Sequence, residues 1–321
     1  MRTTFALLAS LFVLCGGTFA ADAPSRTADQ PKPKAAKKTP QPKDVPTHAD
    51  VSYGPHPHQL MDIYLPKGKG PFPVLVWYGA IWVPKKGPAN PGMFLSHQCA
   101  EIAVQTRSMG DAQKDHVNPP ISYVLGDARR AVKYVHLHAK DWNLDPDRIA
   151  TAGSSQAAVP ALFAACTAAT ADARSADPVD REIVRLVAVA LHRGPGSIDP
   201  KRLQEWNPGV EWGAPAWGCS VPESIRRYHE LYPVISKWSP EYFVSKDTPP
   251  IFIENEWGLT RPENIAEANY RTHSPLWGIG LKKYVEARGV TCYQKYPGLK
   301  SEKYKDIWDF LIRRLQPTVK E

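Results

Sequence analysis

A short β-prone run that breaks at a glycine and two serines is the feature that most constrains this chain. The segment Ile149-Ala150-Thr151-Ala152-Gly153-Ser154-Ser155-Gln156-Ala157 leads from that run directly into an alanine-rich helix. A tight strand-to-helix turn of the G-x-S-x-G type lifts its central serine above a sheet, and by register that serine is Ser155. Ala157 replaces the last glycine and keeps the small volume that the turn needs. A plain helix N-cap is the alternative, but the position after a strand favours an exposed Ser155.

Strand-like and helix-like segments alternate along the rest of the chain. Strands are predicted at 59–65, 73–78, 184–191, 250–253 and 291–296, and helices at 127–140, 156–169, 276–288 and 306–315. The run at 73–78 is continuously apolar, as expected for a central strand that is covered on both faces. Strands separated by helices predict an α/β fold with a mostly parallel sheet. Residues 194–247 form a longer interruption of this pattern, typical of a cap-like insertion.

The chain resembles the α/β-hydrolase superfamily, in particular secreted bacterial esterases of the lipase and feruloyl-esterase-like type. The likeness is strongest over Pro119–Val132, continues through Asp145-Pro146-Asp147-Arg148-Ile149 to Ala158, and extends more weakly from Gln59 to Leu315. The resemblance implies a mostly parallel central sheet flanked by helices. It also implies a carboxylic ester hydrolase that works by acyl transfer through Ser155 on small or carbohydrate-linked esters. No cofactor and no metal are implied.

The resemblance also implies where the other catalytic groups should lie. The backbone N–H groups of Gln156, Gly79 and Ala80 are the expected oxyanion donors, although Ala80 and Ile81 stand where relatives have glycines. The acid should follow the strand at 250–253, where Glu254 and Glu256 are the candidates. Both could equally be ordinary loop carboxylates.

The general base is the weak point of this assignment. Relatives place a histidine after the last strand, but residues 297–304 contain none. His273 is the candidate that remains, and it could reach Ser155 only by an unusual route. His192 and Lys300 are less favoured as the base, because a structural histidine and a solvated lysine are the commoner cases. A catalytically degenerate protein that binds a ligand without turnover is therefore the alternative function.

The N-terminal end of the chain predicts export. Residues 1–20 have the pattern of a signal peptide, 21–46 that of a Pro/Lys-rich linker, and 47–316 form the expected hydrolase domain. A secreted or periplasmic location follows. The linker holds six Lys and Arg against three Asp and so contributes about +3 to the formal net charge of +8. This charge distribution argues against nucleic-acid binding and favours at most a weak attachment to anionic surfaces. No integral membrane segment is expected.

Tryptophans and cysteines add two smaller expectations. Trp206, Trp212 and Trp217 cluster in the insertion, where they could stack on a ligand or fill a local core, and we favour the core. Four cysteines remain after signal cleavage, with Cys166 expected as a buried thiol and one disulfide allowed among the four.

Overall fold

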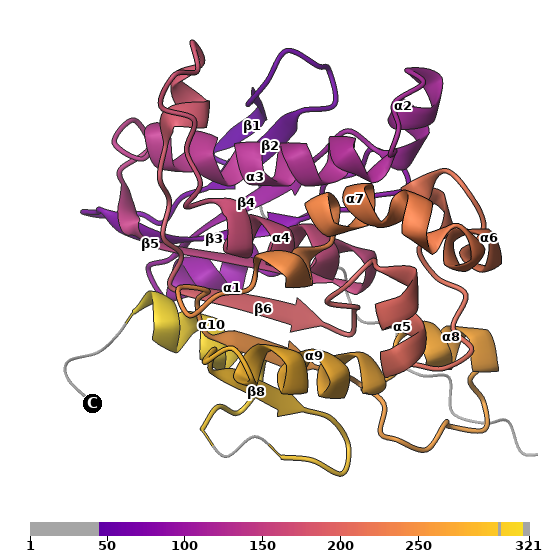
Figure 1. The fold of residues 1–321 in the computed structure, drawn as a ribbon. Coiled ribbons are helices and arrows are strands. Elements are labelled where there is room, and N and C mark those ends of the chain that lie inside the picture. Colours follow the sequence, from indigo (N-terminus) through magenta and orange to yellow (C-terminus); the bar gives the residue numbers. More distant parts are fainter. Residues whose placement is uncertain (1–44, 301–302, 317–321) are drawn as a thin grey trace, which may run out of the picture. The chain divides into compact units, whose positions relative to one another are not determined.

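The computed structural model describes residues 45–300 and 303–316, so the predicted signal peptide and nearly all of the linker lie outside them. An eight-stranded sheet runs through this part of the chain in the order β1-β2-β4-β3-β5-β6-β7-β8 (Figure 1). The strands are β1 (His48–Ser52), β2 (Leu60–Tyr64), β3 (Phe72–Tyr78), β4 (Ala100–Gln105), β5 (Leu144–Ser154), β6 (Ala188–His192), β7 (Ile251–Glu254) and β8 (Cys292–Lys295). β1, β2 and β4 pair antiparallel, and every pairing from β4 to β8 is parallel. The predicted α/β fold is confirmed.

Helices cover both faces of the sheet because the central strands are apolar on both sides. One face packs against α3 (Ile121–Leu137), α4 (Ala158–Thr167) and α9 (Leu276–Glu286). The other face packs against α1 (Pro91–Ser96) and α10 (Ile307–Leu315). All seven residues of β3 are buried, as its continuous apolar run predicts. Because β5, β6 and β7 are parallel neighbours, their carboxyl ends lie at one edge of the sheet, where ligands bind in open α/β folds.

The predicted insertion lies between β6 and β7. It contains α5 (Pro200–Trp206), α6 (Val221–Arg226) and α7 (Tyr228–Trp238), with short 3-10 turns at Ala214–Trp217 and Pro240–Phe243. Trp217 is buried and donates from Nε1 to the carbonyl of Ile198 at 3.0 Å. Trp206 lies so close to Gly280 that a Cβ there would come within 2.2 Å of its ring. These two tryptophans fill the core of the insertion and its junction, as expected, while Trp212 is half-buried against Trp82.

Several elements were not predicted from the sequence. β1, β4, α1, α2 (Met109–Lys114) and α8 (Glu267–Thr272) are short, and β4 carries a buried Glu101 that interrupts its apolar run. α3 begins at Ile121 rather than 127, because Ile121, Val124 and Leu125 are buried with helical spacing. Two 3-10 turns complete the order, Ser155–Ala157 and Pro178–Arg181.

Two further expectations concern the cysteines and the membrane. Cys99, Cys166, Cys219 and Cys292 are all free thiols, so the allowed disulfide is not formed among them. Cys166, which was expected to be buried, is only partly buried as a residue, although desolvation raises the pKa of its thiol to about 12. Within residues 45–300 and 303–316, no helix combines the length and the apolar character needed to cross a membrane.

Candidate active site

Ser155 lies at a strained turn between β5 and α4. Its φ is +55°, in the left-handed region that a serine rarely adopts. Gly153 makes the turn sterically feasible, because a Cβ at that position would lie 2.1 Å from the carbonyl oxygen of Ala157. Ser154 stands at the N-cap position of the 3-10 turn but makes no side-chain capping bond. The local geometry is therefore that of a nucleophile elbow and not of a capped helix, and Ser155 is partly exposed.

A histidine from a distant part of the chain meets this serine. Nε2 of His273 lies 2.9 Å from Oγ of Ser155, although 118 positions separate them in the sequence. His273 is the C-cap residue of α8 and lies in the long segment that follows β7. The contact between His273 and Ser155, which was expected only by an unusual path of the chain, is present in the structure. The candidate base therefore lies one strand earlier than the resemblance implies.

The other ring nitrogen of His273 determines which tautomer is present. Nδ1 lies 3.1 Å from the carbonyl oxygen of Asn269 and 3.0 Å from its Oδ1, with Thr272 Oγ1 at 3.3 Å. A carbonyl oxygen can only accept, so Nδ1 must carry the hydrogen and Nε2 must accept from the Ser155 hydroxyl. This is the arrangement that a serine needs to be activated by a base.

The surroundings of His273 keep it neutral. Burial is the largest influence and lowers its pKa, the Asn269 carbonyl raises the pKa, and the positive charge of Arg193 lowers it further. Asn255 Nδ2 donates to the carbonyl of His273 at 3.1 Å, and Nε1 of the buried Trp277 donates to the carbonyl of Thr272 at 3.2 Å. These two bonds hold the histidine segment against β7 and α9.

The two predicted acids do not contact His273. Glu254 accepts from Nζ of Lys295 at 2.8 Å and from the N–H of Ile307 at 2.7 Å, so it supports the start of α10. Glu256 accepts from Nη1 of Arg193 at 2.7 Å and acts on His273 only through its charge. Assigning either glutamate as the hydrogen-bonded acid is therefore wrong for this structure. Asn269 occupies that place, and its position four residues before His273 on a short helix is the signal that the sequence offered.

A second serine–histidine pair lies beside the first. Ser154 Oγ is 3.2 Å from Nδ1 of His192, its partner in the β5–β6 register, and His192 Nε2 is 3.9 Å from Glu256. Burial lowers the pKa of His192. Ser154 has an extended backbone with φ −111° and remains part of the strand, in contrast to Ser155. The elbow geometry therefore singles out Ser155.

The loop after β3 has few backbone donors left for a ligand. The N–H of Gly79 is bonded to Val104 at 2.9 Å, and the N–H of Ala80 to Lys85 at 3.1 Å. The assignment of Gly79 and Ala80 as oxyanion donors is corrected accordingly. Gly79 is needed for a different reason: a Cβ there would lie 2.0 Å from the carbonyl oxygen of Lys85, across the narrow turn.

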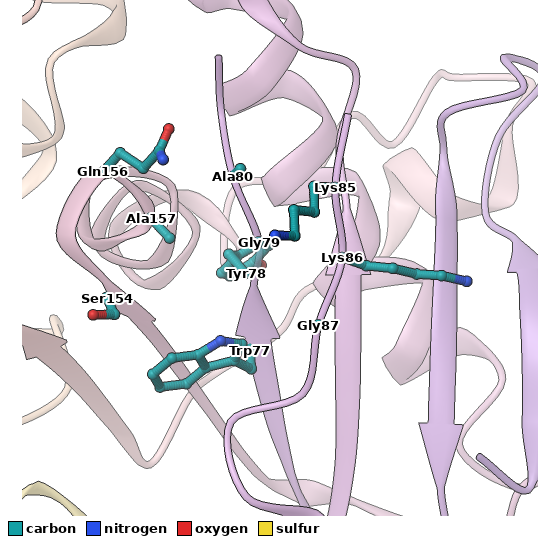
Figure 2. Close-up of a pocket in the computed structure, with 10 residues that line it drawn as sticks. All are labelled: Trp77, Tyr78, Gly79, Ala80, Lys85, Lys86, Gly87, Ser154, Gln156 and Ala157. Carbon is teal, nitrogen blue, oxygen red and sulfur yellow. The ribbon is translucent and has the colours of Figure 1, made fainter. Parts of the chain in front are cut away.

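A cavity of about 240 Å³ lies beside the elbow (Figure 2). Ser154 and Gln156 line it from the elbow side, and Trp77, Gly79 and Lys85 are among the residues on the other side. In Figure 2 the Lys85 side chain reaches toward Gly79, whereas Lys86 points away. Ser155 is not among the lining residues, so this cavity does not open directly onto Ser155.

The fold and the elbow define the chain as an α/β-hydrolase, and comparison with known proteins narrows the class. The BD-FAE family model matches residues 61–256, and the chain belongs to this family. The matched region includes Ser155 but ends before His273. The candidate base His273 thus lies in the part of this chain outside the family match.

One curated relative and two solved structures illustrate the similarity. A probable isoprenylcysteine alpha-carbonyl methylesterase, ICMEL1, of Arabidopsis thaliana is 34% identical over 122 residues, which cover 36% of this chain and 24% of the relative. A truncated carbohydrate esterase from gut microbiota matches with a TM-score of 0.57 and 20% identity, over 87% of this chain and 99% of that one. Esterase B from Lactobacillus rhamnosis matches with a TM-score of 0.52 and 18% identity, over 79% and 76%. The two structures support the fold, and the relative shares only about a quarter of its length with this chain.

Proposed function

We propose that this protein hydrolyses carboxylic esters by acyl transfer through Ser155, with small or carbohydrate-linked esters as substrates. The observation that carries the proposal is the 2.9 Å contact between Ser155 Oγ and His273 Nε2, with Nδ1 held by an oxygen that can only accept. The esterase relatives and the family support the same chemistry, and the name of the gut carbohydrate esterase supports the choice of substrate class.

The proposed reaction follows from this geometry. Ser155 Oγ attacks the ester carbonyl carbon while its proton moves to Nε2 of His273. The resulting imidazolium donates the proton to the departing alcohol as the ester bond breaks. A water molecule then attacks the acyl group while His273 takes its proton. The bond to Ser155 Oγ breaks, Oγ regains a proton from His273, and the acid is released. Asn269 offers two neutral oxygens to the imidazolium in place of a carboxylate.

A ligand-binding protein without turnover is the competing function. It is favoured by the engaged N–H groups of Gly79 and Ala80, since an oxyanion without donors is poorly stabilised. A covalent probe separates the two functions. We expect a fluorophosphonate to label the wild-type protein and Ser154→Ala, but not Ser155→Ala, when adducts are counted by intact-protein mass spectrometry. Equal labelling of all three variants, or none of the wild type, would favour ligand binding.

The depressed pKa of His273 predicts the pH dependence of hydrolysis. The base works only when it is unprotonated, so the rate should rise with pH through a midpoint below the ordinary value of about 6.5 and stay level through neutrality. Asn269→Asp places a negative charge beside Nδ1 and should move the midpoint upward by about 1 unit or more. The measurement is kcat/KM between pH 4 and 9, with the exposed Asn264→Asp as the control. Coincident profiles for wild type and Asn269→Asp would exclude the Asn269 side chain as a partner of the base.

A further inference from the structure

An oxyanion above Ser155 needs two hydrogen-bond donors, and the backbone supplies only one obvious candidate. That candidate is the N–H of Gln156, which follows Ser155 at the start of the turn into α4. The N–H groups of Gly79 and Ala80 are bonded to backbone carbonyls. Those of Ile81 and Trp82 donate to the side chain of Gln156, at 3.0 and 3.3 Å. In hydrolases of this fold this loop provides the second donor, but here these four N–H groups are already hydrogen-bonded within the protein.

The two bonds from the loop orient the Gln156 amide. Both donors are backbone N–H groups, so the atom facing them must be the oxygen Oε1 and not the nitrogen. With its two lone pairs engaged, Oε1 holds the amide plane against Ile81 and Trp82. Nε2 then faces away from the loop with two N–H donors.

Those two donors are available to a ligand. Within residues 45–300 and 303–316, no hydrogen bond from Gln156 Nε2 to the protein is present. The atom is also absent from the buried polar atoms that lack a partner in this part of the chain, so it is not fully buried. Gln156 lines the cavity beside the elbow and is itself only partly exposed. An oriented and unshared amide therefore sits on the residue next to Ser155.

We propose that Nε2 of Gln156 donates the second hydrogen bond to the oxyanion, in place of a backbone N–H from the loop after β3. The inference rests on the proposed acyl transfer through Ser155. As the ester carbonyl becomes tetrahedral, its oxygen gains negative charge and is bound by the N–H and the Nε2–H of one residue. The loop contributes indirectly, since the N–H groups of Ile81 and Trp82 fix the amide in place. The side-chain amide of Gln156 thus takes the place of the backbone N–H that a flexible, glycine-containing loop donates in relatives.

Two substitutions of Gln156 test this role. Gln156→Glu keeps oxygens for Ile81 and Trp82 but removes the amide N–H, and Gln156→Ala removes the whole side chain without adding charge. Loss of one oxyanion donor costs roughly 10²–10³ in kcat. We expect that loss in both variants, with KM changed by less than about threefold, because the donor acts mainly on the transition state. Gln113→Glu on the surface of α2 is the matched exchange and should leave both constants unchanged. Thermal unfolding of each variant shows whether the fold is retained.

The outcomes distinguish this role from its rivals. If the Gln156 side chain blocks the loop donors, Gln156→Ala frees them and its kcat equals or exceeds that of the wild type. If the side chain only anchors the loop, Gln156→Glu keeps wild-type kcat. Either result overturns the donor role while Ser155-dependent hydrolysis by the wild type stands. A wild type without such hydrolysis overturns the proposed function and, with it, this inference.

Discussion

Replacing His273 by glutamine is expected to lower kcat/KM for a simple ester by roughly 10⁴–10⁶-fold, since loss of the base in a well-studied serine hydrolase costs about 10⁶. Glutamine is similar in length and can hydrogen-bond to Ser155, but its amide cannot take the proton of the attacking hydroxyl. His273 is the one histidine whose nitrogen contacts Ser155 Oγ in the described part of the chain.

His192→Gln is the matched control for this prediction. His192 is also partly buried, also has a lowered pKa, and contacts a serine of the same turn, but that serine is Ser154. We expect less than about a tenfold change in kcat/KM for this variant. Similar losses in the two variants, or a larger loss for His192→Gln, would show that the strand serine and His192 form the working pair.

Gly153→Ala is expected to destabilise the protein by about 3 kcal/mol or more and to abolish hydrolysis. The added Cβ would lie 2.1 Å from the carbonyl oxygen of Ala157 and 3.0 Å from its Cβ. The colliding oxygen belongs to the backbone, so the clash is relieved only by opening the turn that presents Ser155. Overpacking and strain of this kind are among the few causes of large losses in stability.

Gly126→Ala provides the opposite case in the same fold. Gly126 lies within α3, and no atom approaches the position of its missing Cβ within 4 Å. Alanine there should stabilise the protein by about 0.5–1 kcal/mol, because glycine weakens a helix interior. Urea unfolding of both variants measures the difference. Equal stability of Gly153→Ala and wild type would mean that the turn is looser than this structure has it.

The predicted and the observed elements agree where one local pattern decides the structure. The strand β3 and the G-x-S-x-A turn could both be predicted, since each depends on residues that are adjacent in the sequence. The start of α3 was placed too late, because the burial of Ile121 and Val124 depends on what packs over them. β4 was missed because Glu101, its second residue, interrupts the apolar pattern of a buried strand.

The candidate catalytic residues divide in the same way. The prediction of Ser155 at an exposed turn required only the chain around Gly153, and its positive φ follows from that local geometry. His273 was named as a candidate on weaker grounds, and its contact with Ser155, 118 positions away, depends on how α4, β6, the insertion and β7 fold between them. The prediction of Glu254 or Glu256 as the acid failed because both side chains bind charged residues that the local sequence pattern does not indicate.

The sequence by itself therefore determined the scaffold, the elbow and the identity of the exposed serine, since steric limits on a glycine turn and the alternation of strands act over short range. Only the tertiary structure decided what surrounds that serine. Which nitrogen meets Ser155, which oxygen holds Nδ1 of His273, and which N–H groups are consumed by Gln156 depend on loops that come together after the sheet has formed. Contacts of this kind are set by the packing of whole elements, and a one-residue shift in any loop would change them.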